Sequence, residues 1–81
     1  MPKFKKNSMS IKETVFKALR NNTTVNDEGF TKHDIFIWVQ EIDPSIKDGA
    51  NVGFSINALV NDGLIEVMNP EHRPVKYRRI K

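Results

Sequence analysis

Residues 59–66 decide the fold, because a helical pattern changes to a strand pattern within them. They are Leu59-Val60-Asn61-Asp62-Gly63-Leu64-Ile65-Glu66. Just before and within this stretch, apolar residues recur at helical spacing: Val52, Ile56, Leu59 and Val60. Gly63 lacks a Cβ and suits the left-handed position beyond a helix C-terminus, whereas residues 64–68 are β-prone. We expect a helix capped by Asn51 that ends at Gly63, followed by a strand.

A hairpin is predicted downstream of this junction. Residues 69–74 read Asn-Pro-Glu-His-Arg-Pro, which is rich in turn-forming residues. Residues 75–80 are again β-prone and place Val75 and Tyr77 on one face. The two β-prone runs, 64–68 and 75–80, are therefore expected to pair across this loop.

A first helix is predicted from residue 11 to Asn21-Asn22. Ser10 and Glu13 have the spacing of a capping box, in which each side chain bonds the other residue's backbone N–H. An apolar stripe at helical spacing follows: Ile11, Val15, Ala18 and Leu19. Phe16 lies at the edge of this stripe.

A second helix is predicted after a turn at residues 26–29 and a very short strand at 29–31. Thr31 and Asp34 repeat the capping pattern. The helix should end near Glu41, because Pro44 disfavours helical geometry at the residue before it. Its inward stripe is Ile35, Trp38, Val39 and Ile42, with Phe36 on the flank and Ile37 pointing away.

Composition narrows the possible classes of protein. The chain has 81 residues, 38% of them apolar and 28% charged, and no cysteine. These values indicate one small globular domain without disulfides or thiolate metal sites. The sequence has no apolar run long enough to span a membrane and no signal peptide, so we expect a cytoplasmic location.

Charge is strongly segregated along the chain. Residues 1–20 have a net charge of +5, residues 21–71 of −7, and residues 72–81 of +5. Basic ends can neutralise phosphates and release their counterions. They can equally be solvated termini, so charge alone does not distinguish nucleic-acid binding from simple solvation of the chain ends.

The element order, residues 59–66 and residues 73–80 together resemble the winged helix-turn-helix DNA-binding family. Residues 73–80 are Arg-Pro-Val-Lys-Tyr-Arg-Arg-Ile, similar to the family's basic second wing strand. The resemblance covers roughly residues 10–80. It implies an α+β winged helix at 10–81 (three short helices and a C-terminal hairpin, the wing) after a flexible basic arm at 1–9. It further implies that the third helix enters the major groove and that the wing follows the backbone or minor groove.

The third helix departs from the family's pattern, because residues 51–62 contain no Lys or Arg. Its candidate contacts with bases are Asn51, Phe54, Ser55, Asn57, Ala58 and Asn61. Asn can read adenine, and Phe or Ala can touch a thymine methyl, which favours A·T pairs. The same asparagines could instead form an ordinary solvated face.

Basic residues outside this helix are the candidate phosphate contacts. In the wing they are His72, Arg73, Lys76, Arg78 and Arg79, and in the arm Lys3, Lys5 and Lys6. The alternatives are a hairpin edge protected by charge against aggregation and a solubilising tail.

Phe36, Ile37 and Phe54 could form a surface for a second copy or another protein. They could instead pack under residues 43–50 or under the arm through Phe4 and Met9.

Other side chains with chemical potential have plainer interpretations. Trp38 and Tyr77 are expected in the core, and His33 and His72 on the surface without metal-ligand spacing. The carboxylates of Asp27-Glu28 and of Asp43 and Asp48 are expected in turns. The sequence has no phosphate-binding glycine loop and no nucleophile motif, so we expect no enzymatic activity, cofactor, metal or small-molecule substrate.

Two functions remain open. The first is a sequence-preferring protein that binds double-stranded DNA as a transcriptional regulator or a recombination or excision accessory factor, of bacterial or phage type. The second is an adaptor of the same fold that binds a polymerase, nucleoid or defence protein through an apolar surface. The fold alone does not decide between them.

Overall fold

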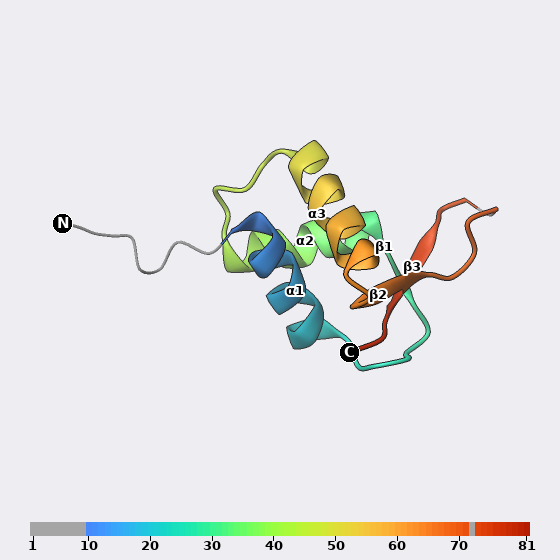
Figure 1. Ribbon diagram of the computed structural model, residues 1–81. Coiled ribbons are helices and arrows are strands. Elements are labelled where there is room, and N and C mark those ends of the chain that lie inside the picture. Colours follow the sequence, from blue (N-terminus) through green and yellow to red (C-terminus); the bar gives the residue numbers. More distant parts are fainter. Residues whose placement is uncertain (1–9, 72) are drawn as a thin grey trace.

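A computed structural model describes residues 10–71 and 73–81 of the chain (Figure 1). Within them the elements follow in the predicted order. They are α1 (Ile11–Asn22), β1 (Phe30–Thr31), α2 (Lys32–Ile42), α3 (Gly49–Asn61), β2 (Ile65–Val67) and β3 (Lys76–Arg79). The described part of the chain is therefore an α+β fold with three helices and a three-stranded antiparallel sheet.

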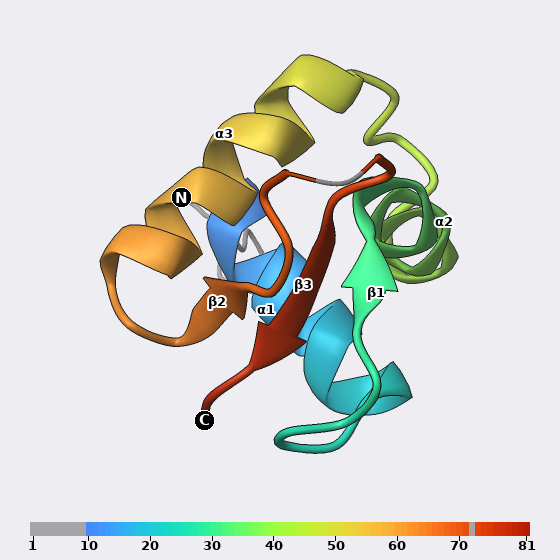
Figure 2. The same cartoon turned by 90° about the vertical axis from the view of Figure 1, so that its right-hand side faces the viewer.

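The sheet has the strand order β1-β3-β2, so the last strand lies in the middle (Figure 2). Phe30 lies opposite Tyr77 on one side of β3, and Val67 lies opposite Tyr77 on the other. The predicted pairing of the two C-terminal strands is thus confirmed. No sequence pattern indicated which strand β1 would join.

β2 and β3 are shorter than the β-prone runs predicted. On the loop side, the backbone N–H of Lys76 donates to the side-chain oxygen of Asn69 at 3.1 Å. This side chain takes the place of a backbone carbonyl of the neighbouring strand. At the other end, the N–H groups of Ile80 and Lys81 both donate to the carbonyl of Leu64. The regular ladder stops at both ends for these reasons.

The core lies between the inner face of the sheet and the helices, as Figure 2 shows with α1 behind the sheet. It contains most of the predicted helix stripes and one residue of each strand: Val15, Ala18, Leu19, Phe30, Ile35, Val39, Val52, Ile56, Leu59, Ile65 and Tyr77. The other stripe residues, Ile11, Trp38, Ile42 and Val60, are partly buried and pack against this core. Trp38 packs against this core and meets Phe30 edge to face, with ring centroids 5.9 Å apart. The core assignments of Trp38 and Tyr77 are confirmed.

The first two helices begin where their capping boxes predicted. Ser10 Oγ accepts the N–H of Glu13 at 3.1 Å, and Glu13 accepts the N–H of Ser10 at 2.9 Å. Thr31 and Asp34 make the same reciprocal pair at the start of α2. α2 continues one residue past the predicted end at Glu41, to Ile42, and Asp43 is its C-cap.

The predicted start of α3 at Asn51 is wrong. The helix begins at Gly49, because the carboxylate of Asp48 accepts the N–H of Ala50 at 2.9 Å and caps the helix earlier. Its end is as predicted: Gly63 has a φ of +77°, and its N–H donates to the carbonyl of Val60. Leu64 N–H donates to the carbonyl of Leu59, which completes a Schellman motif.

Candidate nucleic-acid interface

The outward face of α3 lies opposite its buried stripe. Asn51, Phe54, Asn57 and Asn61 are exposed. Among the large apolar residues that the structure describes, Phe54 is the most exposed, at 71%. Ser55 and Ala58 are half-buried on the flanks of this face. The Ser55 hydroxyl donates to the carbonyl of Asn51 within the helix, at 3.0 Å. The predicted set therefore divides into four outward and two flanking residues.

A groove of about 510 Å³ lies between the loop that joins β2 to β3, residues 68–75, and the start of α2. Arg73, Pro74 and Val75 line one side, and Lys32 and His33 the other. Arg73, Lys32 and His33 are exposed. Lys76, at the start of β3, is exposed as well. The loop thus brings a C-terminal cation next to a cation from the acidic middle of the chain.

A second groove, of about 220 Å³, joins this region to α3. Lys32 and His33 line it together with Gly49, Val52 and Gly53 of α3. The same two residues therefore border both the 68–75 loop and the first turns of α3. Figure 2 shows α3 and the start of α2 on either side of that loop. We call Lys32, His33, Arg73 and Lys76 the basic rim.

Sequence reasoning did not include Lys32 and His33 in the candidate interface. The signal that could have found them is their position directly after the capping residue Thr31, at the N-terminus of a helix that follows a strand. His33 is on the surface, as predicted. Lys32 was not considered because it belongs to residues 21–71, whose net charge is −7.

The last two predicted wing cations are engaged within the protein. Arg78 on the outer face of the sheet forms an ion pair with Glu66, its cross-strand neighbour. Arg79 is directed to the end of α1, where its guanidinium donates to the carbonyl of Thr23 at 3.0 Å. It also donates to the carbonyl of Lys81. We therefore leave Arg79 outside the interface that we propose.

The remaining candidates are placed as follows. His72 and the arm residues Lys3, Lys5 and Lys6 lie outside the described residues, as do Phe4 and Met9. Phe36, on the flank of α2 as expected, is partly buried against the core and lines the smaller groove with residues of α3, a neighbour that the sequence did not predict. Ile37 points outward and is 43% exposed.

The loop carboxylates act as backbone acceptors, in agreement with the prediction. Asp27 accepts the N–H of Gly29 at 2.9 Å, and Asp43 accepts the N–H of Ser45 at 3.0 Å. Among residues 10–71 and 73–81, no group of three or more His, Cys, Asp or Glu side chains is arranged to hold a metal ion. In the same part of the chain, no helix has the length and apolar character needed to cross a membrane.

Comparison with protein-family models, curated proteins and solved structures finds no match to this chain. The function proposed below therefore rests on the arrangement of the described residues.

Proposed function

We propose that this chain is a winged helix-turn-helix protein that binds double-stranded DNA. In this proposal α2 and α3 form the helix-turn-helix, and the 68–75 loop is the tip of the wing. The observation that carries it is the basic rim beside the outward face of α3. The sheet order β1-β3-β2 supports it, because the middle position of β3 directs the loop toward the start of α2.

The chemistry of the two parts suits different roles in DNA recognition. The outward face of α3 has no charged side chain between Gly49 and Asn61, and it presents amide groups and one aromatic ring. Asn57 and Asn61 can donate to and accept from an adenine edge, and Phe54 can contact a thymine methyl. The cations of the rim can neutralise phosphates on either side of the groove that α3 would enter.

The test is a titration of the protein into labelled random duplex DNA by fluorescence anisotropy at several salt concentrations. We expect the double variant Lys32→Ala/Arg73→Ala to lower the slope of log K against log salt by about two, since each lost phosphate contact removes about one. The matched control is Lys17→Ala/Arg20→Ala on α1, which removes the same charge. Equal slopes for the two double variants would contradict the proposed interface.

One observation favours the alternative function, a protein-binding adaptor. The Phe54 ring is 71% exposed on a helix without cations, a surface that suits a partner protein as well as a DNA groove. If the wild-type protein does not bind duplex DNA even at low salt, the DNA proposal fails and the adaptor remains. If it does bind, Phe54→Asp should weaken binding, because a carboxylate there would repel phosphates.

A further inference from the structure

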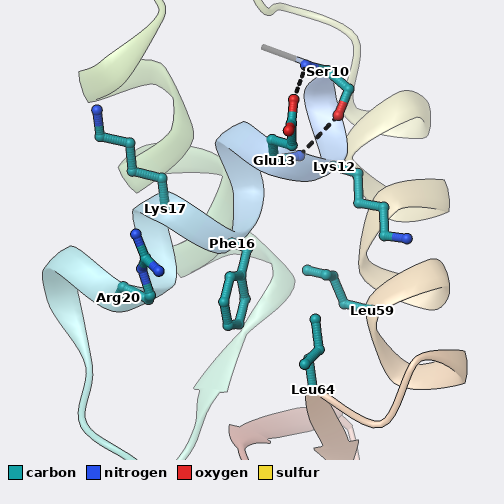
Figure 3. Close-up of a pocket in the computed structure, with 8 residues that line it drawn as sticks. All are labelled: Ser10, Lys12, Glu13, Phe16, Lys17, Arg20, Leu59 and Leu64. Carbon is teal, nitrogen blue, oxygen red and sulfur yellow. Dashed lines mark hydrogen bonds between the residues drawn. The ribbon is translucent and has the colours of Figure 1, made fainter. Parts of the chain in front are cut away.

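A second surface lies along α1, separate from the basic rim. It is a groove of about 570 Å³ between α1 and the end of α3 (Figure 3). Phe16 projects into it from α1, and Leu59 and Leu64 face the ring from the opposite wall. Leu59 belongs to the buried stripe of α3, so this groove opens on the side of the helix away from Phe54. Its floor is apolar.

Two guanidinium groups approach the Phe16 ring. Arg20 Cζ lies 5.6 Å from the ring centroid, and Arg79 Cζ lies 5.9 Å from it. Both distances fall within the range of cation–π attraction. All three nitrogens of the Arg79 guanidinium donate to the carbonyls of Thr23 or Lys81. The Arg20 guanidinium makes no hydrogen bond or ion pair to any residue of the described ranges, so its planar fork is oriented by the ring and open to a ligand.

The other charged side chains along the groove determine the sign of its net charge. Lys12 pairs with Asp62, which neutralises both. Glu13 is held in the capping box by the N–H of Ser10. Lys17 and Arg20 are exposed on the outer side of α1, beyond Phe16 (Figure 3). The groove therefore combines an apolar floor with a positive edge at Lys17 and Arg20, which form no ion pair with the described residues and outnumber the one unpaired carboxylate of the lining, Glu13.

We propose that this groove binds an acidic amphipathic peptide segment of another protein. An apolar side chain of the segment packs on Phe16 and Leu64, above the buried Leu59, and its carboxylates accept from Lys17 and Arg20. Arg is suited to this because its fork accommodates both oxygens of a carboxylate. The apolar floor favours a peptide over a nucleic-acid backbone, because a sugar-phosphate chain offers no apolar side chain to fill it. The protein would then bind DNA on one face and a protein partner on another.

The test is selection from a displayed library of random peptides of about 16 residues, long enough for about four helical turns. The full-length protein is the bait, and Lys17→Glu/Arg20→Glu is the counter-selection bait. We expect enriched sequences to combine Asp or Glu with large apolar residues. Affinity of an enriched peptide, measured by anisotropy, should fall at least about tenfold in Arg20→Glu, as for an interface hot spot. Lys32→Glu is the matched charge reversal in the basic rim and should change the peptide affinity little.

A second variant separates the groove from general electrostatics. Phe16→Leu keeps an apolar floor but removes the ring that orients Arg20, and it should also weaken the selected peptide. Thermal melts by circular dichroism establish that each variant is folded before its affinity is compared.

The proposal would be overturned if no peptide were enriched, or if the enriched peptides lacked acidic residues. It would also be overturned if an enriched peptide bound the wild-type protein and Arg20→Glu with equal affinity. A loss of DNA salt slope in Lys17→Ala/Arg20→Ala equal to that in Lys32→Ala/Arg73→Ala would make the groove a DNA surface instead. Self-association in sedimentation that Arg20→Glu abolishes would identify a second copy as the occupant. The DNA titration and the peptide selection fail independently, because they address different faces.

Discussion

Replacing Arg79 with alanine tests whether this cation stabilises the fold or contacts DNA. Its position in a basic C-terminal run suggests a phosphate contact, whereas the structure directs its guanidinium to the end of α1. There it bonds the carbonyl of Thr23 and stacks on Phe16. These contacts join residue 79 to residues distant in the sequence. The variant should therefore lower stability and leave the charge-dependent part of DNA binding unchanged.

The magnitude follows from the contacts that the variant removes. A hydrogen bond from a charged donor contributes about 1.5–3 kcal/mol, and the partial exposure of the Arg79–Thr23 bond places it at the lower end. The cation–π contact at such a site adds about 0.5 kcal/mol. The bonds to the Lys81 carbonyl are exposed and add little. The sum is about 2 kcal/mol, which lowers Tm by roughly 12 °C in a domain of this length.

Thermal unfolding followed by circular dichroism measures the effect, and two variants serve as controls. Arg78→Ala removes the same charge from the outer face, where the half-exposed pair with Glu66 contributes at most about 1 kcal/mol. Arg73→Ala should leave Tm unchanged and lower the DNA salt slope by about one. Arg79→Lys retains the charge but cannot reproduce the fork, so it should recover only part of the lost stability.

A nearly unchanged Tm together with a reduced salt slope would refute this assignment of Arg79. If Arg79→Ala melts within about 3 °C of wild type while its salt slope falls by one, Arg79 contacts phosphate and its bond to Thr23 is dispensable. The assignment of Arg79 to the joint between α1 and β3 would then be wrong.

The backbone and cap predictions can be tested together by urea unfolding. Gly29→Ala should destabilise by more than Gly63→Ala, although both glycines have positive φ. A Cβ at Gly29 would lie 3.2 Å from the backbone carbonyl oxygen of Tyr77 in the middle strand, and the φ of +105° is strained for any L side chain, whereas nothing lies within 4 Å of a Cβ at Gly63. The Gly63 variant should cost about 1 kcal/mol from φ strain alone. Ser10→Ala should cost about 1 kcal/mol, and Glu13→Gln, which can still accept the N–H of Ser10, should cost less; equal losses would contradict the capping-box interpretation.

Local sequence patterns predicted most of the helical part of the fold. Ser10 with Glu13 and Thr31 with Asp34 specify their helix starts, because each pair is satisfied by neighbouring backbone groups alone. Asn51 failed as a cap because Asp48 stands three residues earlier with the same capacity, and nothing in the intervening residues opposes a helix. Local patterns could not rank these two acceptors.

Long-range partners set the parts that the sequence did not predict. Thr31 and Lys76 pair across most of the chain, and no local pattern specifies which strand a two-residue segment joins. Arg79 and Lys32 show the same limitation at the candidate site. From their positions along the chain, Arg79 was assigned to the wing and Lys32 to the acidic middle segment. In the fold, Arg79 is directed toward α1, and Lys32 lies beside Arg73.

The distribution of engaged and open cations predicts the salt dependence of the DNA binding that we propose. Lys12 and Arg78 are paired with carboxylates, and Arg79 is bound by carbonyls. In the rim, Lys32, Arg73 and Lys76 supply three formal positive charges. With a slope of about −0.9 for each phosphate neutralised, these three give a salt slope of about −2.7. A markedly steeper slope that a truncation before Ser10 returns to about −2.7 would show that the lysines at positions 3, 5 and 6 also reach phosphates.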